Sequence, residues 1–304
     1  MAQKDIKSRI ASVKNIQKIT RAMEMVAAAR LRRAEQRIEA LRPYAGAIRR
    51  MTRQASNAAE NIPGLPILAE HEQIRRVGLM FVTGDRGLAG AFNSQILRAG
   101  LRAADEHGSQ DREVRYYSSG KRGVSSLTFR GHELSGRYTG FTDRPVYANA
   151  REIAEDLMTA YVDGELDEVE IFYNGYISPL SQVVRRETLL PLQHEKTDLL
   201  QAEDRVAGGT GDDIDEHHRA LVEYEPSPEA ILSRLIPDYV EISVYRALLE
   251  STASEHGARM TAMRNASDNA GELIDDLTLE MNRARQAEIT QEIMEVVAGA
   301  EALG

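Results

Sequence analysis

The chain contains no cysteine and no tryptophan, and only 5% of its residues are aromatic. Without cysteine there are no disulfides, no thiolate metal sites and no cysteine nucleophiles. Because aromatic side chains are scarce, alanine, methionine and leucine supply most of the apolar content of the terminal thirds. This composition favours slim packing of helix on helix over a thick core, so we expect an elongated molecule.

Long apolar runs are also missing. The longest covers residues 77–82, whereas a membrane-spanning helix needs about 20 apolar residues. The first ten residues, MAQKDIKSRI, include no apolar segment of the kind found in secretion signals. We therefore expect a protein that neither spans a membrane nor is exported by a signal peptide.

Apolar residues do recur in steps of three and four at both ends of the chain. The C-terminal series, in which only His256 and Ser267 are polar, is Leu249, Ala253, His256, Met260, Met263, Ser267, Ala270, Ile274, Leu277, Met281 and Ala284. The N-terminal series is Ile6, Ile10, Val13, Ile16, Ile19, Met23, Ala27, Leu31, Ala34, Ile38, Leu41, Ala45, Ile48, Thr52 and Ala55. Such stepping is typical of helices that bury one face against a partner helix.

The charges of the two ends are opposite. Residues 1–57 hold fourteen Lys and Arg against four Asp and Glu, whereas residues 227–304 hold six against fourteen. A basic helix beside an acidic one is favoured electrostatically. We expect a first helix that opens with Asp5 or Ser8 near its cap, bends once at Pro43 and ends around Ala58, and a second over residues 227–301, with Ser227 as N-cap. At about 1.5 Å per residue they would be about 80 and 110 Å long, and they would pair into an antiparallel shaft.

The middle of the chain alternates strand and helix signals. Buried strands are expected at residues 76–83, 113–117 and 168–173, with helices at 92–107, 121–129 and 147–163. Turns at Asn174-Gly175 and Ser178-Pro179 would lead to an antiparallel edge strand at residues 181–190. This order predicts a small Rossmann-like α/β domain.

The fold class expected is therefore α/β plus a long antiparallel coiled coil. Its parts would be an N-terminal coiled-coil helix (1–60), the Rossmann-like α/β domain (61–194), an acidic linker (195–226) and a C-terminal coiled-coil helix (227–304). The linker is expected because residues 195–225 hold ten acidic groups and little apolar content.

Two glycine-rich turns lie where phosphate-binding loops would be. Residues 84–90 follow a strand and precede a helix, but their glycines stand three apart and Arg86 occupies the second glycine position of a dinucleotide fingerprint. Gly120-Lys121 resembles the end of a P-loop, yet Arg115 and Arg122 stand where a glycine and a hydroxyl are needed. A structural turn is favoured at the first place. At the second a solvated turn is favoured, with a basic contact to an acidic partner as the alternative.

Other candidate chemistry is weak. His217 and His218 lie beside four acidic residues in the linker, where solvated charge is favoured over a metal site. His256 interrupts an apolar stripe and is expected to be packed. No catalytic residue, cofactor or metal site is therefore predicted. Basic residues spread around the first helix without aromatics, in a chain of net charge −9, do not favour binding to nucleic acid.

Six segments together resemble a known family. They are residues 6–13 (IKSRIASV), 19–29 (ITRAMEMVAAA), 85–88 (DRGL), 120–123 (GKRG), 259–270 (RMTAMRNASDNA) and 282–293 (NRARQAEITQEI). In this order they are similar to the gamma subunit of the F-type ATP synthase, the central stalk of the rotary motor. The resemblance covers nearly the whole chain. Ala89 and Ala91 stand where many members of the family have cysteine and glycine.

The resemblance implies a non-catalytic rotor that couples rotation of the membrane c ring, driven by proton flow, to ATP synthesis, and that regulates ATPase activity. It implies the alpha, beta and epsilon subunits and the c ring as partners, and a peripheral place at the cytoplasmic face of the cell membrane. By resemblance, the contacts with the surrounding subunits are Met23, Arg259, Arg285, Gln286, Thr290 and Glu292. Tyr224 and Glu225 are similar to residues at the foot near the c ring.

One observation from the residues supports this. After Ala284 the apolar stripe continues through Ile289, Ile293, Val296 and Ala300, where the N-terminal helix is no longer expected to cover it. An apolar face on a lone helix tip implies an enclosing partner. Two alternatives stay open, a coiled-coil scaffold or clamp protein and a nucleotide-dependent enzyme.

Overall fold

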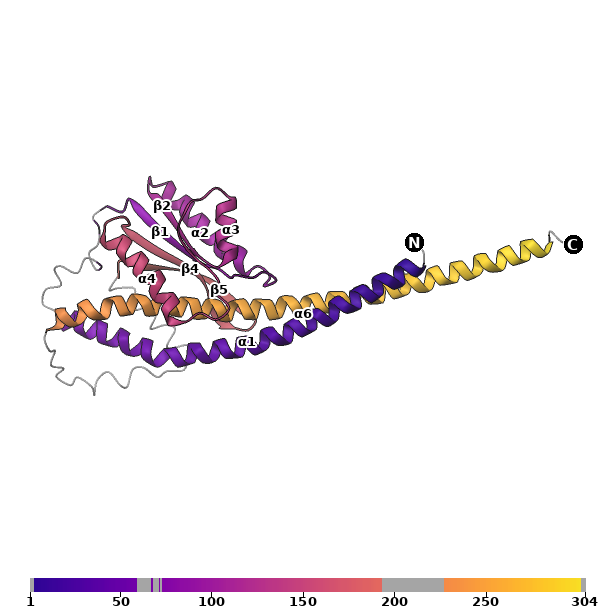
Figure 1. Cartoon of the computed structure of the whole chain (residues 1–304), viewed down its shortest axis with the longest axis horizontal. Coiled ribbons are helices and arrows are strands. Elements are labelled where there is room, and N and C mark those ends of the chain that lie inside the picture. The colour runs from indigo at the N-terminus through magenta and orange to yellow at the C-terminus, as the bar shows by residue number, and fades with distance from the viewer. Residues whose placement is uncertain (1–2, 59–66, 68–70, 72, 193–226, 302–304) are drawn as a thin grey trace.

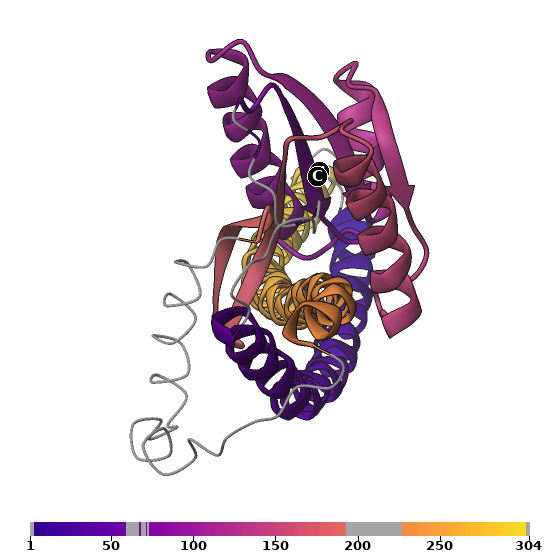
Figure 2. The same ribbon diagram turned by 90° about the vertical axis from the view of Figure 1, so that its left-hand side faces the viewer.

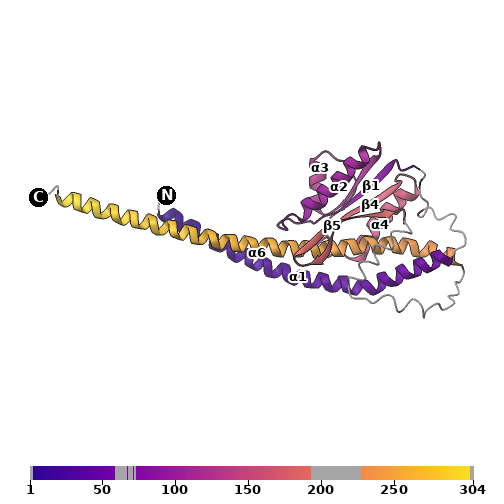
Figure 3. The same ribbon diagram turned by 180° about the vertical axis from the view of Figure 1, so that it is seen from behind.

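The computed structural model describes residues 3–58, 67, 71, 73–192 and 227–301. Two long helices, α1 (Gln3–Ala58) and α6 (Pro228–Glu301), run antiparallel side by side and form what we call the shaft (Figures 1 and 3). An α/β domain lies on one side of this pair (Figure 2). The paired long helices, the Rossmann-like insert and their order along the chain confirm the predicted fold class.

The ends of the long helices follow local sequence signals. α6 begins at Pro228, whose missing N–H is not needed at a first helical position. The hydroxyl of Ser227 accepts the N–H of Ala230 at 3.2 Å, so Ser227 is the N-cap as predicted. α1 continues through Pro43. The bend expected at Pro43 stays a prediction.

The shaft is closed by apolar side chains at three heights. They are Ile6 and Ile10 with Leu277, then Leu31 and Ala34 with Ala253, and then Ile48 with Leu235 and Ile242. Low numbers in α1 meet high numbers in α6, as antiparallel helices require. The stripes predicted from the sequence account for the first two clusters. In the third, Leu235 and Ile242 lie before Leu249, where the predicted C-terminal series begins.

One stretch of the predicted stripe is wrong. Ile16 and Ile19 are 53% and 59% exposed, whereas Gln17 and Thr20 face α6. The Nε2 of Gln17 donates to the carbonyl of Ser267 at 3.2 Å. The cause is the heptad itself. Alternating steps of three and four from Ile10 lead through Val13 to positions 17 and 20, so the isoleucines lie one residue off the seam.

The α/β domain contains one five-stranded sheet in the order β3-β2-β1-β4-β5. β1 pairs in parallel with β2 and β4, β2 pairs in parallel with β3, and β4 pairs antiparallel with β5. The strands are β1 (Arg76–Val82), β2 (Glu113–Ser119), β3 (Leu134–Tyr138), β4 (Glu168–Ser178) and β5 (Ser181–Leu190). The helices of the domain are α2 (Phe92–Gly108), α3 (Lys121–Phe129) and α4 (Tyr147–Val162). The antiparallel edge strand predicted at residues 181–190 is confirmed.

Two strand predictions need correction. β3 was not expected, because its inward positions are Leu134, Gly136 and Tyr138 and give little apolar signal. The turn expected at Asn174-Gly175 is wrong, since β4 continues to Ser178. Asn174 is 1% exposed and its amide donates to the carbonyl of Phe92 at 3.2 Å, which satisfies a polar side chain inside a buried strand.

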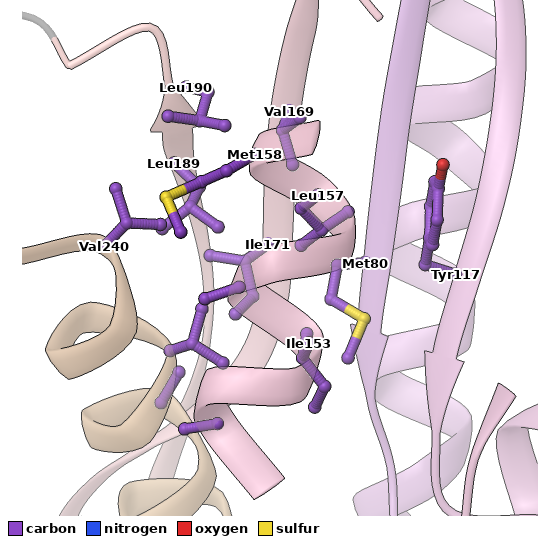
Figure 4. Close-up of a cluster of buried hydrophobic side chains, with 14 of the residues drawn as sticks. Met80, Tyr117, Ile153, Leu157, Met158, Val169, Ile171, Leu189, Leu190 and Val240 are labelled. Atoms are coloured by element: carbon purple, nitrogen blue, oxygen red, sulfur yellow. The ribbon is translucent and has the colours of Figure 1, made fainter. Parts of the chain in front are cut away.

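Two cores cover the two faces of the sheet. On one face, Leu79 and Phe81 of β1 pack with α2 and with Leu127 of α3. On the other, Met80 and Val82 pack with α4 and with the first part of α6 (Figure 4). The α6 side chains in this second core are Leu232, Ile236, Val240, Val244, Ala247 and Leu248. The first turns of α6 therefore belong both to the shaft and to the core of the α/β domain.

Candidate functional site

The carboxyl edge of the parallel strands is where doubly wound sheets hold their ligands. Here that edge is formed by residues 84–90 after β1, by Gly120 after β2 and by residues 139–143 after β3. Asp85 ties the three together. Its carboxylate accepts the N–H groups of Lys121 at 3.1 Å, Gly140 at 3.0 Å and Thr142 at 3.2 Å, as well as the Thr142 hydroxyl at 3.0 Å.

These hydrogen bonds set the charge of Asp85. Burial alone would raise the pKa of this carboxyl, but the N–H groups of Gly140 and Lys121 and the Thr142 groups outweigh it, so the pKa is lowered. The Asp85 carboxylate is therefore negatively charged, and its hydrogen bonds are satisfied within the chain.

The start of α3 is equally closed. Its first N–H groups, which a P-loop leaves free for phosphate, are taken by neighbours. Besides the Lys121 N–H, the Arg122 N–H donates to the carbonyl of Gly84 at 3.1 Å, and the Gly123 N–H donates to the Thr83 hydroxyl at 2.9 Å. The interpretation of both glycine-rich turns as structural agrees with this geometry.

α6 crosses the same edge and bonds to it turn by turn. The Ser251 hydroxyl donates to the carbonyl of Val82 at 3.3 Å, and that of Ser254 donates to the carbonyl of Asn174 at 3.0 Å. The Thr252 hydroxyl proton is shared between the carbonyl of Leu248, at 2.7 Å in the same helix, and that of Thr142 at 3.0 Å. These small hydroxyl side chains let the helix approach the ends of the strands closely. The helix, and not a bound molecule, therefore fills the crevice.

The next turn of α6 brings charged groups into this junction. Glu255 and His256 are 3% and 1% exposed, and Arg259 is 9% exposed. The guanidinium of Arg259 bonds to the Glu255 carboxylate at 2.5 Å and to the carbonyl of Gly87 at 3.3 Å. Burial raises the pKa of Glu255 against the opposing effect of Arg259, and burial together with Arg259 lowers the pKa of His256 to about 4.

The residues predicted to contact other subunits fall into separate groups. Arg285, Gln286, Thr290 and Glu292 lie on the end of α6 that passes beyond the start of α1, and all four are exposed. Met23 is half-buried on α1. Arg259 lies in the junction with the α/β domain. Tyr224 and Glu225, like the pair His217 and His218, lie outside the described residues.

The end of α6 is apolar and uncovered. Every side chain of residues 285–298 is exposed, including Ile289 at 45%, Ile293 at 58% and Val296 at 71%. α1 begins beside Met281 and Ala284, which still pack against its Ile6 cluster. The unpaired stripe predicted beyond Ala284 is therefore present at Ile289, Ile293 and Val296, and the side chain of Ala300 lies outside the described residues.

Sequence reasoning missed the Asp85 anchor and the Glu255 contact. One signal was available. The run Ser251-Thr252-Ala253-Ser254 places small side chains on successive positions of a helix, and such a run permits close approach to another backbone. Within the described residues there is no group of three or more His, Asp or Glu side chains that would hold a metal ion, and no helix there is long and apolar enough to cross a bilayer.

The chain consists of a long antiparallel helix pair with an uncovered tip and of an α/β domain. In that domain α6 fills the crevice where related sheets hold a ligand. Together these features define a class of mechanical shaft proteins. A family model described as "ATP synthase" matches residues 2–303. The "ATP synthase gamma chain" of Rubrobacter xylanophilus is 44% identical over 300 residues, covering 99% of this chain and 98% of that one, and that of Moorella thermoacetica is 44% identical with the same coverage. The chain belongs to the ATP synthase gamma chain family.

Solved structures agree with this assignment. The central stalk and c ring of Tetrahymena thermophila mitochondrial ATP synthase include a chain that is 28% identical with a TM-score of 0.59, covering 82% of this chain and 99% of that one. A chain of the Euglena gracilis mitochondrial ATP synthase (OSCP/F1/c-ring) has a TM-score of 0.66 at 18% identity, covering 99% and 94%, which supports the fold alone. The family resemblance found in the sequence is confirmed.

Proposed function

We propose that this chain is the rotating central stalk of an ATP synthase, which carries rotation of the membrane c ring to the catalytic hexamer of alpha and beta subunits. Its family and the rotor and central-stalk structures it is similar to support this role. The observation that carries it is the uncovered end of α6. A single helix with an apolar face is stable in water only when a partner covers that face.

The mechanism follows from the shape. Beyond the α/β domain the shaft is a helix pair that continues as α6 alone, so the part proposed to lie inside the hexamer presents a different face in each direction (Figure 1). When it turns inside a ring of subunits, each beta subunit meets these faces in succession. One face of the shaft favours the closed state of a beta subunit and another face favours the open state. Rotation therefore shifts the populations of the two states in each subunit in turn. The chain itself contributes no catalytic group, and its filled crevice fits that role.

The tip residues are proposed as bearing contacts. Arg285, Gln286, Thr290 and Glu292 offer polar side chains, while Ile289 and Ile293 offer apolar area worth about 25 cal/mol per Å² buried. The Thr290 hydroxyl already donates to the carbonyl of Gln286 at 2.8 Å, which leaves its oxygen available as an acceptor.

Met23 and Arg259 are proposed as contacts further down the shaft. Met23 is partly exposed on α1. Arg259 is bonded within the chain, so a partner would reach it only through the fraction of its surface that stays exposed, or by competing with Glu255. Tyr224 and Glu225 stay a proposal for contact with the c ring.

The proposed partners are the alpha, beta and epsilon subunits and the c ring, with proton flow as the driving force. The proposed location is the cytoplasmic face of the cell membrane, with peripheral association through the c ring. No described helix crosses a membrane, so attachment would run through the foot, the α/β domain end of the shaft.

Co-expression with alpha and beta subunits tests the proposal. We expect a complex with one copy of this chain to three of each partner, measured by native mass spectrometry. Ile293→Glu with Val296→Glu should weaken it, because both side chains would be buried in the bearing. Phe129→Glu is the matched control, since Phe129 is 92% exposed on α3, away from the tip. Absence of the complex with the unaltered chain would refute the function, and equal weakening by the control would refute the role of the tip.

A static scaffold or clamp protein is the alternative, and it would form the same complex without turning. Rotation of a bead fixed to the α/β domain, observed during ATP hydrolysis by the immobilised complex, separates the two functions. A bound but stationary shaft would favour the scaffold.

A further inference from the structure

The carboxylate of Glu255 lies where a doubly wound sheet brings a ligand phosphate against a glycine. A Cβ atom on Gly84 would stand 2.7 Å from the Oε2 of Glu255, closer than real contacts allow. In dinucleotide-binding sheets the first glycine after the first strand makes a tight turn, and the second lets the backbone approach a pyrophosphate. Here the missing side chain of Gly84 makes room for a carboxylate from α6.

Arg259 completes this contact. It stands four residues after Glu255, so both side chains leave the same face of α6 and meet at 2.5 Å. A buried carboxylate without a partner would be costly, and the guanidinium supplies the opposite charge. Because Arg259 also bonds to the carbonyl of Gly87, one turn of α6 grips residues 84–90 at two points.

A second ion pair joins α1 to the carboxyl edge of the sheet. Asp143, in the segment after β3, pairs with Arg30 of α1, and its carboxylate lies 3.8 Å from the Nε2 of His256. Both side chains of the Arg30 pair are about one third exposed, so it is weaker than the buried pair. Both helices of the shaft thus meet the α/β domain at the carboxyl edge of its sheet.

We infer that the Glu255–Arg259 ion pair is a ligand built into the chain, which takes the place of a bound phosphate at residues 84–90 and fixes the rotational position of the α/β domain on the shaft. The inference rests on the proposed function in one respect, that torque applied at the foot passes into α6 here. Glu255 and Arg259 are then positioning residues. They transmit rotation by holding the domain against twisting.

Three variants test the contact in the full chain. Gly84→Ala places a methyl group against the Glu255 carboxylate and should break the grip, whereas Gly84→Ala with Glu255→Ala has space for it. Glu255→Gln keeps the volume and removes the charge. Gly108→Ala is the matched control, because a Cβ there meets no atom within 4 Å.

Hydrogen exchange of the isolated chain is the first measurement. In Gly84→Ala the amides of residues 84–90 and 120–124 should exchange about tenfold faster, since the edge opens more often. Glu255→Gln and the double variant both lack the ion pair but contain no clash, so their exchange should lie between that of the unaltered chain and that of Gly84→Ala. Gly108→Ala should match the unaltered chain. Unchanged exchange in Gly84→Ala, or a double variant as protected as the unaltered chain, would overturn the inference. If Gly84→Ala does not fold, Glu255→Gln alone decides, and unchanged exchange in it overturns the inference.

The second measurement concerns torque. In complexes reconstituted with all partner subunits in vesicles, Glu255→Gln should lower the ratio of ATP-driven proton pumping to ATP hydrolysis by about twofold or more, while Gly108→Ala leaves it unchanged. An unchanged ratio would show that the contact only stabilises the domain, and would overturn the positioning role. Failure of the unaltered chain to join its partners would refute the proposed function instead, and the exchange data would still decide whether the ion pair acts as a ligand.

Discussion

The two ends of α6 differ in the burial of their apolar side chains. Near its start, Ile236 and Val240 are buried in the core of the α/β domain, at 1% and 0% exposure. Near its end, Ile293 and Val296 are 58% and 71% exposed. Isoleucine and valine are thus buried within this chain at one end of the helix and exposed at the other. One continuous helix thus links a buried core to an exposed apolar surface, which we propose is covered in the assembled complex.

Removing the uncovered end should give the largest effect. Deletion of residues 286–304 is expected to lower coupled ATP turnover of the assembled complex by roughly tenfold or more, because the proposed partner contacts of the tip are lost. The midpoint of thermal unfolding of the isolated chain should stay nearly constant, because the side chains described in this segment, those of residues 286–298, are all exposed. A marked loss of thermal stability would erase the contrast between the two ends.

Substituting isoleucine at each end sharpens the comparison. Ile236→Ala should lower the free energy of unfolding by about 3 kcal/mol, since it leaves a cavity in the second core. Ile293→Ala, the matched change at the tip, should alter it by less than about 0.5 kcal/mol. Urea denaturation of the two variants measures this. Similar losses would mean that the tip is packed in the isolated chain.

Lowering the pH should destabilise the junction where α6 meets the α/β domain, between the two ends of the helix. The folded chain holds the pKa of His256 at about 4, below its ordinary value of 6.5, so the unfolded state takes up a proton that the folded state excludes. The stability contribution is complete above about pH 6.5 and falls toward pH 4, by about 3 kcal/mol in total. Unfolding at pH 7.5 and 4.5 checks this against His256→Asn.

The variant keeps the charged groups that surround His256, namely Arg259, Asp143, Arg30 and Glu255. It should therefore lose only the histidine part of the pH dependence. Equal pH dependence in both proteins would place the titration elsewhere.

The smallest effect is expected in the shaft between the two ends. The hydroxyl of Ser267 is buried without a hydrogen-bond partner in the described structure. Ser267→Ala should therefore raise the free energy of unfolding by about 1 kcal/mol. Ser254→Ala should lower it by a similar amount, because it removes the bond to the carbonyl of Asn174. Chemical denaturation should give opposite signs, and the same sign in both would contradict this account.

The sequence predicted the parts of this fold that local pattern governs. The ends of α2, α3, α4 and β5 and the end of α1 at Ala58 were placed to within a residue or two, because capping signals, prolines and periodicity act over short distances. The start of α1 was left at Asp5 or Ser8, whereas the helix begins at Gln3. β3 escaped because it carries a glycine at a central inward position. Ile16 and Ile19 were misplaced because the heptad spacing from Ile10 leads to Gln17 and Thr20, whereas the apolar residues stand one position earlier.

The candidate site was predicted unevenly for a similar reason. The exposed tip follows from apolar spacing beyond the start of α1, so its residues were found. The grip of Glu255 on Gly84 joins residues 171 positions apart, and no local pattern reports which helix will fill a strand edge. The resemblance placed Arg259 among the partner contacts, whereas packing of the α/β domain on α6 draws it into the junction.

The antiparallel pairing has a consequence for synthesis of the chain. Gln17 bonds to Ser267, 250 residues later, so α1 emerges from the ribosome long before its partner exists. At about 5–20 residues per second, the roughly 170 residues between Ala58 and Pro228 take on the order of 10–30 seconds. During that time the α/β domain cannot close its second core either, because that core also needs α6. α6, which is synthesised after α1 and the strands, therefore completes both the shaft and the α/β domain.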